Sequence, residues 1–228
     1  SPWRPPAARP SPRIAADRAH AAHLTSPAGD YLLSFLAEKG HVLEDYAVKF
    51  VVTAVARMTK YGWFDADDGM RTVVESASKF LQMTVAHCII GLTLLGEVVT
   101  EMNFKNRNRT LTQHRKVAVS FRDASLSTCF EISLSMLNEV ATRAIDLGTL
   151  PADEAARLEE RILVLALQLL VNCLSFDFVG ANPDEDTDPT AVQVPTQWRE
   201  RLQHGATMRL LFNVYKGCTT GKISIIPD

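Results

Sequence analysis

The sequence predicts an all-α protein in which helical hairpins stack side by side as an α-solenoid. Beyond about residue 27, apolar residues recur at intervals of three and four, which is the spacing of one helix face. No stretch of alternating apolar and polar residues is long enough to build a sheet. The helical patterns pair into hairpins of about 40 residues, the period expected of HEAT or armadillo-like arrays.

The first helical patterns lie before residue 82. Apolar residues from Tyr31 to Leu36 predict a short helix that Gly40 closes. A longer helix follows and ends near Gly62. Its apolar stripe consists of Phe50, Val51, Ala54, Val55 and Met58. The acids of Asp65–Asp68 then offer several N-caps for a third helix through Val73 to Leu81, because carboxylates are favourable at the positive end of a helix.

The most apolar stretches of the chain predict core helices. Ile89–Val99 and Ile162–Leu174 both fall short of the roughly 20 residues that a membrane-spanning helix needs. Gly91 and Gly96 lie inside the first stretch, where small residues would let another helix approach closely. A polar and basic connection, FKNRNRTLTQHRK, covers residues 104–116.

Three more helices are expected after this connection. One runs through Phe121 to Leu137 and is ended by Gly148. The sequence Thr149-Leu150-Pro151 starts the next, which covers about Ala152–Leu174 and is apolar almost all round in its later turns. Such a helix must be covered on more than one side, as in the inner layer of a stack. The pattern Met208–Tyr215 predicts a last short helix.

Composition divides the chain into three parts. Residues 1–26 contain five prolines and four arginines against one acid, and they lack the large apolar residues that offset ordering entropy. We therefore expect a disordered or extraneous leader at 1–26, a HEAT-repeat segment at 27–217 and an irregular tail at 218–228. The cysteines lie far apart without a CxxC pair, which favours buried reduced thiols over disulfides or zinc ligands. They are Cys88, Cys129, Cys173 and Cys218.

No motif predicts catalysis, a cofactor or a metal. The chain lacks the short signatures of hydrolases, phosphate loops, dinucleotide folds and metalloproteases. The acids of Asp184–Asp188 alternate as in a calcium loop, but Pro189 and Pro195 stand where glycine and glutamate are required. His20 and His23 have helical ligand spacing with no third ligand nearby. At 228 residues, 46% hydrophobic content and a formal charge of -2, the chain predicts a soluble protein and not a polyelectrolyte.

The helical pattern breaks between Leu174 and Glu200. This stretch, LSFDFVGANPDEDTDPTAVQVPTQWRE, combines aromatic residues, an acidic cluster and prolines. We interpret it as a crossover whose ends are anchored by packed aromatic residues, while Pro183–Thr190 stays mobile and solvated. The alternative is a ligand-binding aromatic patch. The aromatic residues concerned are Phe176, Phe178 and Trp198.

The strongest charge feature is the run from Lys105 to Arg122, which contains six basic residues and no acid. It predicts either a docking surface for an acidic partner or a solvated connection followed by a helix whose basic residues pair with neighbouring repeats. The near-neutral chain and the lack of interleaved exposed aromatic residues argue against a nucleic acid as that partner.

Four strings carry a family resemblance. They are ARMTKYGWFD at 56–65, KFLQMTVAHCIIGLTLLGEVVTEMN at 79–103, LTQHRKVAVSFRDASL at 111–126 and VNCLSFDFVGANPDEDTDPTAVQVPTQWRE at 171–200. In this order they resemble the exportin-7 family, Ran-binding nuclear transport receptors of the importin-β superfamily. The resemblance covers about residues 31–215 and corresponds to a piece from the N-terminal third of such a receptor.

The resemblance implies a superhelix of HEAT repeats that binds Ran-GTP and protein cargo, crosses the nuclear pore by contacting pore proteins, and releases both ligands after GTP hydrolysis. The hydrolysis belongs to Ran, so the chain would be a carrier and not an enzyme, without a cofactor or membrane insertion. Its location would alternate between nucleus and cytoplasm. From the matching string HRKVAVSFRD, the candidate partner-facing residues are Arg115, Lys116 and Arg122.

Two other functions compete with this one. A helical scaffold or regulatory subunit of another complex would bind its partners without regard to a nucleotide. An uncharacterised enzyme would need a pocket with convergent titratable groups, for which the sequence supplies no candidate.

Overall fold

The computed structural model describes residues 27–64, 69–106, 109–145, 150–177 and 196–220. No strand occurs among them, so the predicted all-α class is confirmed for this part of the chain. A helix at 27–39 comes first. The α-helices after it are α2 (Asp45–Tyr61), α3 (Val73–Phe80), α4 (Val85–Asn103), α5 (Leu111–Phe121), α6 (Ser127–Thr142), α7 (Ala152–Leu174), α8 (Thr196–Gln203) and α9 (Gly205–Thr219). The short helical turns are η1 (Gly40–Val42), η2 (Gly69–Thr72) and η3 (Arg122–Leu126).

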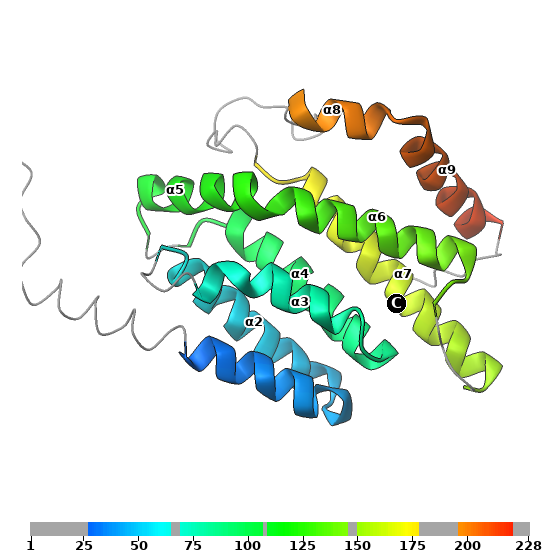
Figure 1. The fold of residues 1–228 in the computed structure, drawn as a ribbon, viewed down its shortest axis with the longest axis horizontal. Helices are drawn as coiled ribbons and strands as arrows, with labels where there is room; N and C mark the ends of the chain where they lie inside the picture. Colours follow the sequence, from blue (N-terminus) through cyan, green and yellow to red (C-terminus); the bar gives the residue numbers. More distant parts are fainter. Residues whose placement is uncertain (1–26, 65–68, 107–108, 146–149, 178–195, 221–228) are drawn as a thin grey trace, which may run out of the picture.

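The helices pack in two layers, and Figure 1 shows them stacked from the helix at 27–39 to α9. In one layer α4 lies between α2 and α7, and in the other α6 contacts both α3 and α9. In addition, α3 packs on α4 and α6 packs on α7, so consecutive helices form hairpins that join the two layers. This is the arrangement of an α-solenoid, as the sequence predicts.

The central helix is α4, which the neighbouring helices cover on several sides. Among the described helices, α4 alone is long and apolar enough to span a membrane, but 61% of that window is buried inside the fold, which is the situation of a core helix. A Cβ added at Gly91 would lie 2.9 Å from the Ala77 carbonyl oxygen, so the close helix approach predicted there is confirmed. His87 ties α4 to the first helix, since its Nε2 donates to the Ala37 carbonyl at 2.9 Å.

A continuous helical rod formed by α5, η3 and α6 replaces part of the predicted connection. The connection predicted over 104–116 is wrong beyond residue 110, because Thr110 and Gln113 form a capping box that starts α5 at Leu111. The far end also differs from the prediction. Arg143 takes a left-handed conformation, with φ 53 and ψ 39, and ends α6 at Thr142, before Gly148 is reached.

The bounds of the other helices mostly follow the predicted patterns. Helix α7 covers Ala152–Leu174, as predicted, and contacts both α4 and α6. The predicted acidic N-caps of α3 are wrong, because η2 precedes α3 and Thr72 occupies its N-cap position. Helix α9 continues to Thr219, into the part predicted as an irregular tail. Cys88, Cys129 and Cys173 are buried free thiols, as predicted, whereas Cys218 is free but only partly buried.

The aromatic residues at the two ends of the predicted crossover are buried. Phe176 is 3% exposed, and its ring centroid lies 5.9 Å from that of Phe121. Trp198 is 6% exposed, and its ring centroid lies 4.7 Å from that of Phe130 on α6. The predicted packing of these two residues is therefore confirmed.

The crossover itself is shorter than predicted, because residues 196–203 form α8. Arg201 of α8 pairs through Nε and a terminal nitrogen with both carboxylate oxygens of Glu131 on α6. Contacts with α6, which no local pattern reveals, thus stabilise this polar helix. The predictions for Phe178 and Pro183–Thr190 lie outside the described residues.

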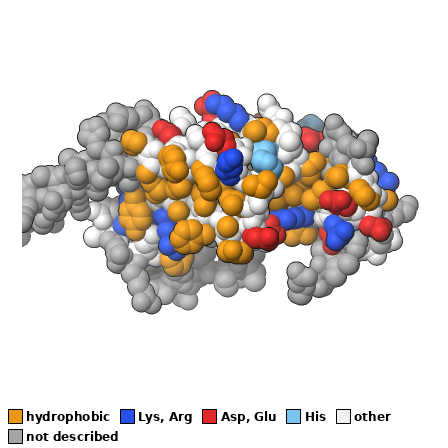
Figure 2. Space-filling view, turned by 90° about the horizontal axis from the view of Figure 1, so that it is seen from below, with side chains coloured by type: hydrophobic (Ala, Val, Ile, Leu, Met, Phe, Trp, Pro, Cys, Tyr) orange, Lys and Arg blue, Asp and Glu red, His pale blue; other side chains and the backbone are white. Residues whose placement is uncertain are grey.

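Both ends of the stack expose large apolar side chains. Figure 2 shows hydrophobic side chains spread over the face seen from below, at the end of the molecule that carries the helix at 27–39. Those at this end include Tyr31, Val42, Tyr46 and Phe50. At the other end most of the predicted apolar stripe of α9 is exposed, while Thr207 and Val214 are the buried residues. Met208, Phe212 and Tyr215 are exposed, whereas Leu211 is partly buried and packs against the core.

Candidate partner-binding surface

The phase of α5 decides which of its residues face solvent. Thr110 Oγ1 accepts from the Gln113 amide, and the Gln113 side chain accepts from the Thr110 amide, which fixes the first turn. One face of the helix then packs into the fold and consists of His114, Val117, Ala118 and Phe121. Arg115 and Lys116 are consequently exposed, as a partner-binding role requires.

Arg115 and Arg122 lie seven residues apart along the rod and therefore project from a similar side of it, about 10 Å from one another along the axis. Val119, 39% exposed, lies between them. Arg122 is half-buried in the π-helical turn η3, and its Nε donates to Asp123 Oδ1 at 2.8 Å. Arg115 has no carboxylate partner among the described residues. Its charge is thus the more available of the two.

Lys116 projects toward a different part of the fold, the corner that follows α2. Its Nζ lies 4.7 Å from the ring centroid of Phe64, which is 41% exposed. Arg71 lies 5.5 Å from the same ring. Cations at such distances are attracted by the face of an aromatic ring, so this corner holds basic and aromatic groups together.

Trp63 fixes this corner to the rod. It is 1% exposed, its Nε1 donates to Ser120 Oγ at 2.9 Å, and its ring packs edge-on against Phe121 with centroids 5.5 Å apart. The backbone carbonyl of Trp63 accepts from Arg71 Nε at 2.8 Å. A rigid support therefore holds Phe64 beside α5.

Lys60 is fully buried beneath the corner and satisfies the end of α4. Its ammonium donates to the carbonyl oxygens of Glu101 and Phe104 and, at 3.2 Å, to Asn106 Oδ1. It also lies 3.6 Å from Glu101 Oε1. A cation at this position matches the unpaired carbonyls and the negative pole of a helix C-terminus. Burial lowers the pKa of Lys60; Glu101 opposes this shift and Arg109 adds to it.

His114, a buried residue of α5, is affected by the charge of Lys60 in this network. Its Nδ1 is buried and has no hydrogen-bond partner among the described residues. Burial lowers the pKa of His114, and the positive charge of Lys60 lowers it further, while Asp177 has the opposite effect. The neutral imidazole is therefore favoured in the folded protein.

This arrangement can bind a partner through charge and apolar contact. Cationic groups beside exposed apolar side chains are suited to carboxylates on a protein surface. No group of three or more His, Cys, Asp and Glu side chains in the described ranges could hold a metal ion.

The three residues predicted from the sequence lie on one rod, but they do not form one cluster. Arg115 and Arg122 share a side, whereas Lys116 stacks on Phe64, which the sequence prediction missed together with Arg71. The prediction found no aromatic residues interleaved with the basic run, yet the fold supplies one from another segment. The pair Trp63-Phe64 just after a helix end was the available signal.

Comparisons with known proteins give a consistent result. The chain is similar to Ran-binding protein 17 of Homo sapiens and to exportin-7-B of Xenopus laevis, with 35% identity to each over 190 residues. It is also 34% identical over 201 residues to Ran-binding protein 16 of Drosophila melanogaster. The first two alignments cover 82% of this chain but 17% of each relative, so the chain spans about a sixth of their length. No protein-family model and no solved structure matches the chain.

Proposed function

The chain belongs to the exportin-7 family over its aligned length, and we propose that it is a segment of a nuclear transport receptor that binds Ran-GTP and protein cargo. The observation that carries this proposal is the similarity over 82% of the chain to proteins named exportin-7 and Ran-binding protein. Those relatives are transport receptors and not enzymes, and we propose the same class of activity for the longer protein.

The exposed apolar ends of the stack support the proposal that this chain is part of a longer solenoid. Tyr46 and Phe50 on α2 are each 78% exposed, and Phe212 on α9 is 65% exposed. Each repeat of a solenoid buries its apolar flank against the next, so terminal repeats without neighbours expose such side chains. Further helices on both sides would cover them.

The proposed mechanism is linked binding. Ran-GTP and cargo would each prefer one curvature of the solenoid, so binding of either would raise the affinity for the other. Hydrolysis of GTP by Ran would then release both. The receptor would shuttle between nucleus and cytoplasm, with nuclear pore proteins as additional partners.

Within this segment, we assign partner contact to Arg115, Lys116 and Arg122. Arg115 and Lys116 are exposed on α5, and the rigid corner of Trp63 and Phe64 supports the surface beside them. The contribution of Arg122 would be smaller, because its guanidinium already bonds to Asp123.

A pull-down tests the proposal with a full-length receptor that contains this segment. Immobilised receptor is incubated with Ran loaded with a non-hydrolysable GTP analogue or with GDP. We expect retention of the GTP form and little of the GDP form. Equal retention of both forms, or of neither, would contradict the Ran assignment, and nucleotide-independent protein partners would favour the helical scaffold.

A charge-reversal pair tests the assigned surface in the same assay. Arg115→Glu with Lys116→Glu should weaken binding of Ran-GTP or of cargo by about tenfold, since two attractions become repulsions. The matched control reverses Lys39 and Arg199, which are exposed on other helices and change the net charge equally. If both double variants bind as the wild type does, the surface assignment is wrong.

A further inference from the structure

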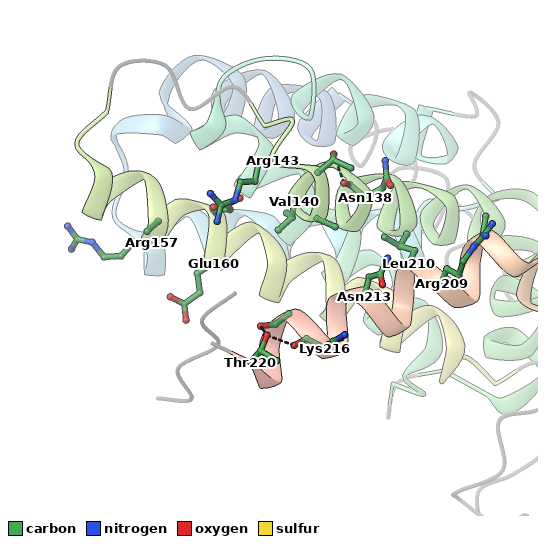
Figure 3. Close-up of a pocket in the computed structure, with 16 residues that line it drawn as sticks. Asn138, Val140, Arg143, Arg157, Glu160, Arg209, Leu210, Asn213, Lys216 and Thr220 are labelled. Carbon is green, nitrogen blue, oxygen red and sulfur yellow. Dashed lines mark hydrogen bonds between the residues drawn. The ribbon is translucent and has the colours of Figure 1, made fainter. Parts of the chain in front are cut away.

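A groove of about 1050 Å³ opens between the end of α6, the start of α7 and one flank of α9. It is separate from the surface on α5. Its lining includes Val140, which is 3% exposed, and the small residues Ala156 and Ala206. Small side chains let the backbone of a bound chain approach closely. Figure 3 shows the groove with α9 along one side and α7 along another.

Three cations that line the groove have no carboxylate partner. Arg143, Arg209 and Lys216 pair with no acid among the described residues, whereas Lys49, Arg161 and Arg201 elsewhere all do. The left-handed backbone at Arg143 ends α6 there, and in Figure 3 its side chain extends from that end toward α7.

The other charged residues of the lining do not cancel this excess. Arg157 also lines the groove, but Figure 3 shows its side chain extending away from α9, and its Nε donates to the Asp153 carbonyl. Glu159 and Glu160 on α7 are the acids of the lining. With the Arg157 side chain directed away, three basic residues against two acids leave the groove with one net positive charge.

The flank of α9 that faces the groove differs from a flank that packs on another helix of the stack. Its polar residues recur at intervals of three and four and are Arg209, Asn213, Lys216 and Thr220, while Ala206, Leu210 and Gly217 complete the α9 side of the lining. The apolar residues Met208 and Phe212 lie on a different side of the same helix. By comparison, α6 buries Leu134 and Leu137 where other helices cover it. The polar, basic flank therefore favours a charged occupant over one more apolar helix.

We propose that this groove binds an extended acidic segment of a protein partner. Arg209 and Lys216 lie seven residues apart on one flank, which is about 10 Å along a helix. A polyproline II segment has three residues per turn and rises about 3.1 Å per residue, so residues three apart lie on the same side of it and about 9 Å from one another. Two carboxylates in a Glu-x-x-Glu pattern would thus meet both cations, and a third could reach Arg143 on the opposite wall. Asn213, between the two cations, offers an amide to the bound backbone.

Fluorescence anisotropy with the 228-residue chain and a labelled synthetic peptide tests this proposal. The probe is a twelve-residue peptide with glutamate at every third position and alanine or serine elsewhere, and its control has glutamine in place of each glutamate. We expect the glutamate peptide to bind at least about tenfold more tightly at low salt and to weaken as ionic strength rises.

Charge-reversal variants locate the binding. Arg209→Glu with Lys216→Glu should weaken the glutamate peptide by about tenfold, because two attractions become repulsions. The control reverses Lys39 and Arg57, which are exposed outside the groove and change the net charge equally. It should bind within about twofold of wild type. Circular dichroism melting confirms that each variant is folded, as expected for exposed positions.

Three results would overturn the proposal: no binding of the glutamate peptide at low salt, equal binding of the glutamine peptide, or equal losses in the two reversal variants. The last result would indicate attraction by overall charge alone. The test does not depend on the Ran assignment, because it contains neither Ran nor nucleotide.

Discussion

Replacement of Lys60 by methionine should destabilise the fold, because the lysine ammonium completes the end of α4. The substitution keeps most of the buried stem and removes the donor to Glu101 O, Phe104 O and Asn106 Oδ1. It also leaves Glu101, whose side chain is 15% exposed, without its cation. Loss of one partner from a buried charged pair costs about 3–5 kcal/mol. Water can reach the connection after Phe104, which is 63% exposed, so we expect the lower part of this range, about 3 kcal/mol.

Thermal unfolding followed by circular dichroism measures this loss. For a domain of this size, 3 kcal/mol corresponds to a fall in Tm of roughly 6–12 °C. The matched control is Lys49→Met on the same helix, because Lys49 is 56% exposed and pairs with Glu97. It should cost less than about 1 kcal/mol. If Lys60→Met is as stable as wild type, or no less stable than Lys49→Met, the lysine does not hold the end of α4.

Two further predictions concern an aromatic anchor and a buried histidine. Trp198→Ala should lower the free energy of unfolding by about 3 kcal/mol, because the Trp198 ring packs on Phe130. The control Phe212→Ala, at an exposed position, should have little effect. An unchanged Tm for Trp198→Ala would contradict the anchoring role. Folding lowers the pKa of His114, so the unfolded chain binds this proton more readily than the folded chain once the pH falls below about 6.5. The free energy of unfolding therefore decreases as the pH falls below this value. His114→Gln should flatten that loss in urea unfolding relative to the wild type. Equal pH slopes in the variant and the wild type would contradict the assignment.

Helices with strong local signals could be predicted from the sequence. The bounds of α7 follow from Pro151 at its start and from its long apolar run, and α4 follows from an apolar pattern that is buried as expected. The start of α5 was also available, since Thr110 and Gln113 have the spacing of a capping box. The prediction instead extended the polar connection to Lys116, because polarity outweighed the cap.

Other features depend on contacts between distant residues. The polar helix α8 is held by Trp198 on Phe130 and by Arg201 on Glu131, which no local pattern contains. The end of α6 depends on a left-handed arginine at a position where glycine is usual.

The candidate site shows the same limit. The sequence places Arg115 and Lys116 on one segment, but the contact of Lys116 with Phe64 joins residues 52 positions apart. The groove beside α9 combines parts of three helices and has no continuous sequence signature.

We propose that this segment belongs to a receptor that distinguishes the nucleotide state of Ran. The most direct test compares two dissociation constants of a full-length receptor that contains this segment. One is for Ran loaded with a non-hydrolysable GTP analogue and the other is for Ran loaded with GDP, and both are measured with saturating cargo. We expect the GTP form to bind at least about tenfold more tightly, within the usual range of coupling between two ligands. Equal dissociation constants for the two forms would contradict it.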